Sequence, residues 1–345
     1  AWLGRSAGCL LGIPCEGMSR GDIAAAARGL GQKYPLQDYW SLDPKPGRSQ
    51  QRQYGLTPRS HMLKPNLRYV GADDDLAYTL LGLLILEESG LDFSPADVGR
   101  AWLKYLPVAC TAERVALDNL RQGLKPPRTA RKRNPYAEWI GADIRSDPWG
   151  YAAAGCPEIA AEFAWRDAVV SHVRNGTYGE MYFSAVIAAA LVVGDVREAL
   201  RIGLTEIPRN CRMARTVKET WRWCERDRDW ARTVERIETR YAGMSAVHTL
   251  NNAALTVAGL LYGRGDFGAT IGLTVMAGMD TDCTAATAGS ILGAVLGARR
   301  LPARWVKPLG ARAETYLIGR DRFGHRDVAR RFVSLALQVR RRAGL

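Results

Sequence analysis

Apolar residues recur with helical spacing along most of this chain, and stretches that alternate apolar and polar residues, as half-buried strands do, are scarce. The periodicity predicts helices over residues 73–89, 157–174, 180–193, 195–204, 212–240, 246–263, 266–277, 283–298 and 324–342. Ser94 before Pro95 is typical of a helix start, and Asn175 before Gly176 is typical of a helix end. We therefore expect an all-α fold.

Two proline-rich segments, residues 34–69 and 123–150, interrupt the helical pattern. Irregular segments of this length in a compact helical protein are usually functional loops. We expect both segments to lie over a binding or catalytic site. The chain shows neither an internal repeat nor a break in composition, so residues 1–345 are expected to form a single domain.

Composition places the chain among ordinary globular proteins, with 47% hydrophobic and 24% charged residues in a length of 345. The net charge of +13 comes from 40 arginines and 8 lysines against 35 acidic residues. Because the arginines are spread along the chain, we interpret them as a solvated basic surface and expect no nucleic-acid partner. A substrate or partner that carries phosphates is the alternative.

The seven cysteines form no CxxC pair and no metal-type spacing, which is typical of free thiols in a reducing compartment. No apolar run reaches the roughly 20 residues that span a bilayer. The N-terminal apolar run is too short and too rich in glycine for a signal peptide. We expect a cytoplasmic protein without a membrane segment.

Two acidic clusters stand directly before strongly apolar helices: Asp73, Asp74 and Asp75 before one, and Asp280 and Asp282 before the other. Capping and the helix dipole explain one carboxylate at a helix start better than two or three. No basic residues lie nearby in the sequence, so the clusters suggest cations between them. Oxygen ligands favour Mg²⁺ or Mn²⁺ over Zn²⁺. Capping alone remains the alternative interpretation.

Small residues form a stripe along the second of these helices, because Ala285, Gly289, Gly293 and Gly297 are spaced four apart. Such a stripe lets another helix pack very close. It would bury the acidic start of the helix, and it would let the helix of the other cluster approach. We expect the two clusters to converge on one cleft.

Several segments, in this order along the chain, resemble the ADP-ribosylglycohydrolase family, which includes the dinitrogenase reductase-activating glycohydrolase. They are "GCLLGIPCEG" (8–17), "GADDDLAYTLL" (71–81), "DPWGYAAAGCPEIAAEFAWRDAVVSHVRNGTYGEMYFSA" (147–185), "HTLNNAALTVAGLLYGRGDF" (248–267) and "GMDTDCTAATAGSILGA" (278–294). The resemblance implies an all-α orthogonal multi-helix bundle with two Mg²⁺ or Mn²⁺ ions in a central cleft.

The family's metal motifs, Thr-Asp-Asp-Thr and Asp-x-Asp-Thr, fall on residues 72–75 and 280–283. The matching positions imply metal ligation by Asp73, Asp74, Asp280 and Asp282. Ala72 and Cys283 stand where the family has threonines that contact the metals, and Asp75 is a candidate for a compensating ligand oxygen.

The resemblance also implies a reaction, in which a metal-activated water cleaves an N- or O-ribosyl bond of an ADP-ribosylated protein or of an ADP-ribose-like nucleotide. The implied catalytic residues are Glu16, Asp74 and Asp282, and the implied substrate-binding residues are Gly176, Tyr178, Gly179, His248 and Asn252. Plain structural roles stay open for Glu16 as a loop acid, Tyr178 as a core residue and His248 as a cap.

Two other functions stay open at this point. The lost threonines and the long proline-rich segments are compatible with a hydrolase of a free nucleotide, a nucleoside or an NAD-derived metabolite. They are also compatible with a relative that binds ADP-ribose without catalysis.

Overall fold

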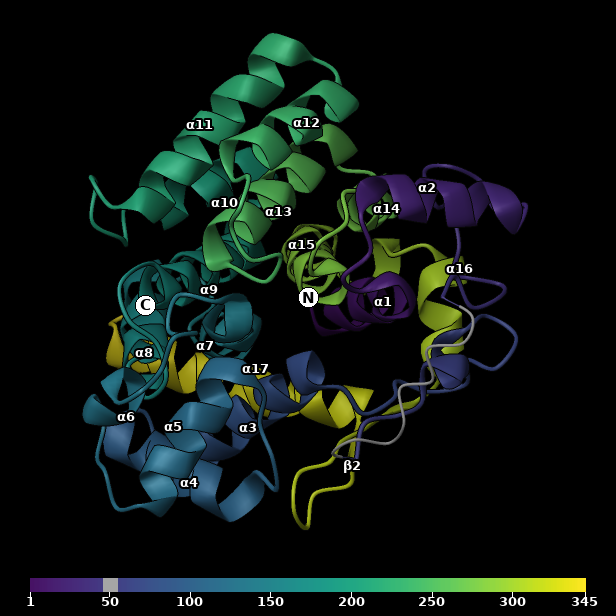
Figure 1. Cartoon of the computed structure of the whole chain (residues 1–345). Coiled ribbons are helices and arrows are strands. Elements are labelled where there is room, and N and C mark those ends of the chain that lie inside the picture. The colour runs from purple at the N-terminus through teal and green to yellow at the C-terminus, as the bar shows by residue number, and fades with distance from the viewer. Residues whose placement is uncertain (46–54) are drawn as a thin grey trace.

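Helices make up most of the computed structural model, which describes residues 1–45 and 55–345 (Figure 1). Its α-helices, in chain order, are α1 (Trp2–Gly12), α2 (Arg20–Gly29), α3 (Asp74–Ser89), α4 (Pro95–Tyr105), α5 (Thr111–Arg121), α6 (Arg128–Arg131), α7 (Ser146–Ala152), α8 (Pro157–Ala168), α9 (Asn175–Val193), α10 (Val196–Gly203), α11 (Arg212–Asp227), α12 (Trp230–Arg240), α13 (Thr249–Gly263), α14 (Phe267–Met276), α15 (Thr281–Leu296), α16 (Ala303–Val306) and α17 (His325–Arg342).

Short 3-10 helices and one small sheet complete the regular structure of the described residues. The 3-10 helices are η1 (Ile13–Cys15), η2 (Arg59–Met62), η3 (Ile140–Arg145), η4 (Ala298–Arg300) and η5 (Lys307–Leu309). Strands β1 (Arg312–Glu314) and β2 (Arg322–Gly324) pair antiparallel. The all-α prediction is confirmed.

Helices α1 and α15 lie at the centre of the molecule. Figure 1 shows them between α10–α13, at the top of the view, and α3–α6, at the bottom. Helix α15 packs on α1, α9, α13 and α14, and its residues 281–293 are all buried. The start of this helix, with its acidic residues, therefore lies deep inside the protein.

Helix α9 is long and apolar enough by composition to cross a membrane. Within the apolar stretch of this helix, 72% of the residues are buried inside the protein. It packs on α7, α8, α10 and α15. Its apolar character is therefore that of a core helix.

The helix predicted over residues 157–174 ends early, and the prediction that Asn175 and Gly176 end a helix is wrong. Helix α8 stops at Ala168, and Asn175 begins α9 after Arg174, whose φ is +50°. The Asn175 side chain accepts a hydrogen bond from Met213 N at 3.0 Å and donates one to Glu138 Oε2 at 2.7 Å. These tertiary bonds, which the local sequence does not show, set the helix start.

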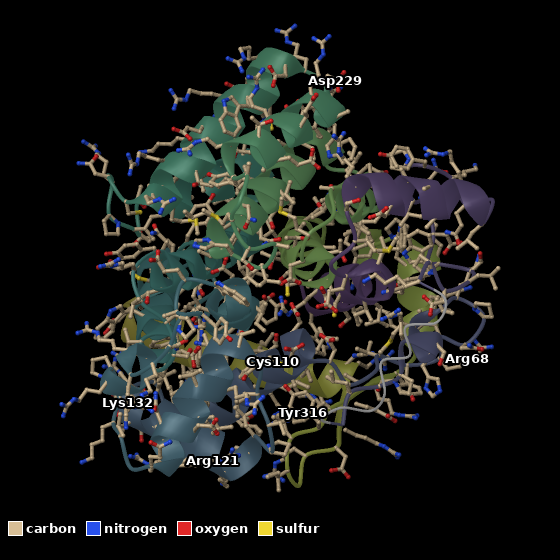
Figure 2. The ribbon with its side chains drawn as sticks, in the orientation of Figure 1. Arg68, Cys110, Arg121, Lys132, Asp229 and Tyr316 are labelled. Carbon is tan, nitrogen blue, oxygen red and sulfur yellow. The ribbon has the colours of Figure 1, made fainter. Side chains whose placement is uncertain are left out.

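The single helix predicted over residues 212–240 is two helices, α11 and α12. Arg228 takes a left-handed conformation with φ +50° and ends α11. Asp229, labelled in Figure 2 at the turn, accepts a hydrogen bond from Arg232 N at 3.1 Å and caps α12. The break allows α12 to fold back on α11 and α13.

The two proline-rich segments contribute to the cleft described below, but the second of them is irregular only in part. Residues 140–152 form η3 and α7 and are buried throughout. Pro148 lies in the first turn of α7, where a helix tolerates a residue without an N–H. In the first segment, residues 46–54, which include Pro46, lie outside the described residues.

The small-residue stripe on α15 does bring another helix very close, as predicted, but that helix is α1 rather than α3. Gly4, Gly8 and Gly12 of α1 are also spaced four apart. A Cβ built on Gly4 would lie 2.1 Å from Gly289 O, and one on Gly8 would lie 1.9 Å from Ala285 O. Neither helix can carry a larger side chain at these points.

Gly297 is not part of this contact. A Cβ at Gly297 would meet nothing within 4 Å, and its φ of +70° places it at the C-terminal cap of α15. The stripe therefore ends one turn earlier than the spacing predicts.

Replacing Gly8 with Ala should lower the free energy of unfolding by about 2–3 kcal/mol, because the new methyl group would overlap rigid backbone. Urea denaturation followed by circular dichroism measures this change. Gly21→Ala is the control, since a Cβ there meets only Ser19 Oγ, at 3.8 Å. A Gly8→Ala protein as stable as Gly21→Ala would contradict the close packing of α1 on α15.

Candidate active site

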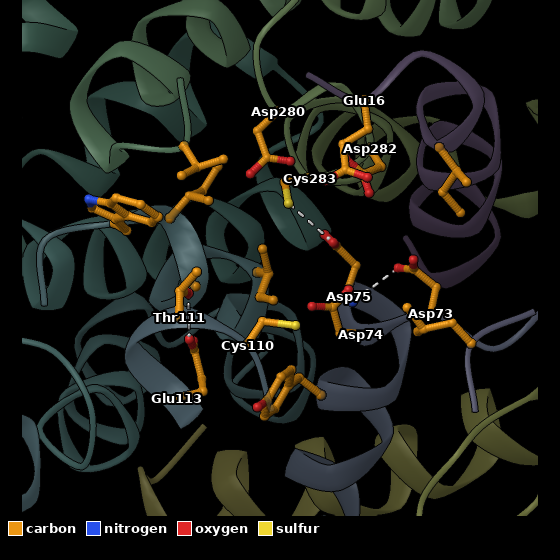
Figure 3. A pocket seen from close by; sticks show the side chains of 18 residues that line it. Glu16, Asp73, Asp74, Asp75, Cys110, Thr111, Glu113, Asp280, Asp282 and Cys283 are labelled. Carbon is orange, nitrogen blue, oxygen red and sulfur yellow. Dashed lines mark hydrogen bonds between the residues drawn. The ribbon is translucent and has the colours of Figure 1, made fainter. Parts of the chain in front are cut away.

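A cleft of about 450 Å³ opens where α3, α15 and the loop after η1 meet. Its walls carry seven carboxyl groups from four separate parts of the chain. Six of them belong to Glu16 and the two aspartate clusters, and Figure 3 shows these around the cavity: Glu16, Asp73, Asp74, Asp75, Asp280 and Asp282. The seventh is Glu113. Both proline-rich segments also reach the cleft, through Leu56 of the first and through Trp139, Ile140, Gly141 and Ile144 of the second.

The first acidic cluster is built on the start of α3. Asp73 is the N-cap, and its Oδ1 accepts hydrogen bonds from Asp75 N at 3.1 Å and from Cys9 Sγ at 3.2 Å. Capping thus accounts for Asp73. It does not account for Asp74 and Asp75, which lie in the first turn and line the cleft.

The second acidic cluster is built on the start of α15. Asp280 is at the N-cap position, but its side chain caps no backbone N–H. Asp282 is 5% exposed, and its Oδ1 has no hydrogen-bond partner among the described residues. Capping therefore explains neither carboxylate of this cluster.

The two clusters meet, as the sequence predicts. Cys283 Sγ, next to Asp282, donates a hydrogen bond to Asp75 Oδ2 at 3.2 Å. Ligand atoms of Asp75, Asp282 and Cys283 lie within 4.8 Å of one another. Residues more than 200 positions apart in the chain thus share one site.

One basic residue that is distant in the sequence pairs with the first cluster. Arg5 of α1 is fully buried, and its Nη2 lies 3.5 Å from Asp75 Oδ1 and 2.7 Å from Asp75 O. Its Nη1 forms a 2.6 Å ion pair with Asp147. Arg5 therefore divides its charge between Asp75 and Asp147, and among the described residues no ion pair with an arginine joins Asp73, Asp74, Asp280 or Asp282.

Burial raises the pKa of every carboxyl group in the cleft, and neighbouring carboxylates raise the pKa of all of them except Asp280 further. The pKa of Glu16 rises to about 7 and that of Asp74 to about 6, each by burial first and by Asp280 second. Burial and Asp74 raise the pKa of Asp73 to about 8. Ionised carboxylates in this cleft are thus destabilised unless a positive charge joins them.

Glu16 follows η1 in a loop that is tied to the second cluster. Gly17 N donates to Met279 O at 2.8 Å, and Met279 N donates to Met18 O at 3.3 Å. A candidate ligand group joins Glu16, Asp280 and Asp282 within 4.8 Å. The structure therefore places Glu16 at the acidic cleft, where the sequence analysis put it.

His248 and Asn252 lie at the start of α13, beside the second cluster. His248 is the N-cap, and its Nδ1 accepts a hydrogen bond from Leu250 N at 3.2 Å. Asn252 is buried, accepts a hydrogen bond from Asp280 N at 3.2 Å and donates one to Ala246 O at 2.7 Å. Asn252 thus positions Asp280, while His248 has the capping role that the sequence analysis left open.

Gly176, Tyr178 and Gly179 do not line the acidic cleft. Tyr178 lines a separate surface hollow with Trp165 and Arg174. A Cβ on Gly179 would come within 2.1 Å of Asp143 Oδ1. A Cβ on Gly176 would come within 2.7 Å of Ala137 O. The two glycines allow close helix packing rather than contact with a ligand in the cleft.

The start of α5 forms one wall of the cleft, and the sequence does not indicate this. Cys110, Thr111 and Glu113 line the cleft, and Figure 3 shows Cys110 beside Asp74. Arg145 Nη1 donates to Glu113 Oε1 at 2.7 Å, and burial raises the pKa of Glu113 to about 7. Nothing in the local sequence marks these residues, since Arg145 is 32 positions away. Arg5, in contrast, is the only charged residue of α1, and a single charge in an otherwise uncharged helix marks it in the sequence as a residue that needs a partner.

The residues of the cleft fit divalent cations. Three groups of potential ligands each lie within 4.8 Å: Asp73 with Asp74 and Asp75, Glu16 with Asp280 and Asp282, and Asp75 with Asp282 and Cys283. Carboxylate oxygens are the ligands that Mg²⁺ and Mn²⁺ prefer. A bound cation would also satisfy Asp282 Oδ1, a buried oxygen that has no hydrogen-bond partner among the described residues.

Comparisons with known proteins identify the fold and the family of this chain. No curated protein matches the chain. A solved structure titled "ADP-ribosylglycohydrolase-related protein complex" is similar with a TM-score of 0.62 and 19% identity, over 98% of this chain and 96% of that one. At this identity the likeness supports the fold alone. The model of the ADP-ribosylglycohydrolase family matches residues 1–337, and the chain therefore belongs to this family.

Proposed function

We propose that this protein is a metal-dependent hydrolase that cleaves an N- or O-ribosyl bond of an ADP-ribosylated protein or of an ADP-ribose-like nucleotide. The observation that carries the proposal is the meeting of Glu16 and both aspartate clusters in one cleft of about 450 Å³. Family membership supports the hydrolysis of a glycosyl bond.

Two Mg²⁺ or Mn²⁺ ions would be held by the aspartates at the starts of α3 and α15: Asp73, Asp74, Asp75, Asp280 and Asp282. Bound cations of this type orient substrate oxygens and lower the pKa of a bound water.

The protein's own residues supply the acid–base and electrostatic parts of the reaction. The Glu16 carboxylate accepts a proton from the attacking water, and its pKa of about 7 suits this task near neutral pH. Negative charge on Asp74 and Asp282 stabilises the positive charge that develops at the anomeric carbon.

The remaining walls suit a nucleotide. Ile13, Leu56 and Val247 are apolar parts of the lining that limit the access of bulk water. Trp139 also lines the cleft and is packed edge-on by Tyr136 at 4.6 Å between ring centroids. Its ring offers a fixed surface for a base.

Replacing Asp282 with Asn should lower the rate of ribosyl-bond hydrolysis by at least about 100-fold, because a charge that stabilises the transition state is lost. The measurement is product chromatography after incubation with Mg²⁺ and ADP-ribosylated arginine, ADP-ribosylated serine or free nucleotides. The control is Asp118→Asn, a half-exposed aspartate on α5 that pairs with Arg121.

The same assay separates the alternatives. Turnover of free nucleotides alone would indicate a metabolite hydrolase. ADP-ribose binding that ignores Mg²⁺, together with no turnover of any substrate, would contradict the proposal and indicate a non-catalytic relative.

In the absence of divalent cations, the protein should become less stable as the pH rises from about 5 to about 8.5. The folded state raises the pKa values of Asp74, Glu16 and Asp73 to about 6, 7 and 8. A group with a raised pKa in the folded state contributes stability below its unfolded pKa, near 4, and loses it as pH rises through the folded value.

Thermal melting in a chelating buffer measures this trend, and saturating Mg²⁺ should largely remove it. Asp282→Asn should raise the metal-free melting temperature at pH 8 and abolish its response to Mg²⁺. A melting temperature that is independent of both pH and Mg²⁺ would show that the carboxyl groups do not share a buried cation site.

A further inference from the structure

We propose that the sulfur of Cys283 is a metal ligand, so that one cation position in the cleft is a mixed oxygen–sulfur position that selects a thiophilic divalent cation, such as Zn²⁺ or Co²⁺, over Mg²⁺. The proposal rests on the proposed metal-dependent function of the same cleft.

Cys283 lies in the first turn of α15 and faces the carboxylates of both clusters. It is 6% exposed and lines the cleft. Its Sγ lies 3.2 Å from Asp75 Oδ2, and a ligand atom of Asp282 lies within 4.8 Å of both residues. Figure 3 shows the sulfur pointing toward Asp75. One sulfur and two carboxylate oxygens thus lie close enough together to bind the same cation.

Asp282 provides an independent sign that a cation belongs here. Its Oδ1 is buried and has no hydrogen-bond partner among the described residues. Leaving a buried ionisable oxygen unpaired is costly, and a bound cation removes that cost. Arg5 does not serve this purpose, because its ion pairs are with Asp75 and Asp147.

The cleft therefore offers two chemically different positions that share Asp282. Glu16, Asp280 and Asp282 form a group with oxygen ligands only, which suits Mg²⁺ or Mn²⁺. Asp75, Asp282 and Cys283 form a group that contains sulfur. Thiolate is a preferred ligand of Zn²⁺, and coordination to a cation removes the proton of a thiol outright.

Two other cysteines near the cleft serve as matched controls. Cys9 Sγ lies 3.2 Å from Asp73 Oδ1, but Cys9 is not part of the cleft lining. Cys110 lines the cleft at the start of α5, but it belongs to none of the three candidate ligand groups in the described residues. Neither thiol shares a possible cation with two carboxylates.

The test is titration of the chelator-treated full-length protein with Co²⁺, followed by near-ultraviolet absorption. We expect a thiolate-to-cobalt charge-transfer band that saturates at a single molar equivalent. Cys283→Thr should abolish the band, whereas Cys9→Ser and Cys110→Ser should retain it. Cys283→Thr should also weaken Zn²⁺ binding by at least about tenfold, while Mg²⁺ affinity stays close to that of the unmodified protein.

A Co²⁺ complex without the band, no Co²⁺ binding at all, or a full band in Cys283→Thr would overturn the proposal. If circular dichroism shows that Cys283→Thr does not fold, Cys283→Ser takes its place.

The outcome of this test is separable from the outcome of the test of the proposed function. Hydrolysis with Mg²⁺ but no band would leave the function standing, and a Cys283-dependent band without hydrolysis would leave the ligand assignment standing.

Discussion

The contact between the backbones of α1 and α15 is the constraint on which the rest of the structure depends. Gly4 and Gly8 lie so close to Gly289 and Ala285 that a Cβ on either α1 residue would lie about 2 Å from a backbone oxygen of α15. Because α1 packs so closely on it, α15 lies at the centre of the protein and its acidic start is buried. Glycine in a helix costs about 1 kcal/mol relative to alanine, so the packing offsets a real conformational cost.

Helix α1 also supplies a guanidinium that pairs with the first cluster, because Arg5 lies on the same short helix as the glycines. Arg5 pairs with Asp75 and Asp147, and Asp282 Oδ1 has no hydrogen-bond partner in the part of the chain that the structure describes. An unsatisfied buried carboxylate oxygen lowers the stability of the folded protein. Such costs are expected at functional sites, and a bound cation would remove this one.

Much of the site could be predicted from the sequence, because its main signals are local. Aspartates before apolar helices and glycines at helical spacing mark the buried start of α15 without any structure. The partner of α15 could not be predicted, since Gly4 and Gly8 are far away in the chain. For the same reason, Asn175 was assigned to a helix end, although its bonds to Glu138 and Met213 make it a helix start. The resemblance implies a substrate-binding role for Tyr178, but this residue lines another hollow.

The central claim is that carboxylates from opposite ends of the chain share cations in one cleft. Anomalous diffraction from crystals grown with Mn²⁺ tests it most directly. The account predicts two anomalous peaks about 4 Å apart, within ligand distance of aspartates from both α3 and α15. Peaks that contact only one cluster, or no peak in the cleft at saturating Mn²⁺, would contradict it.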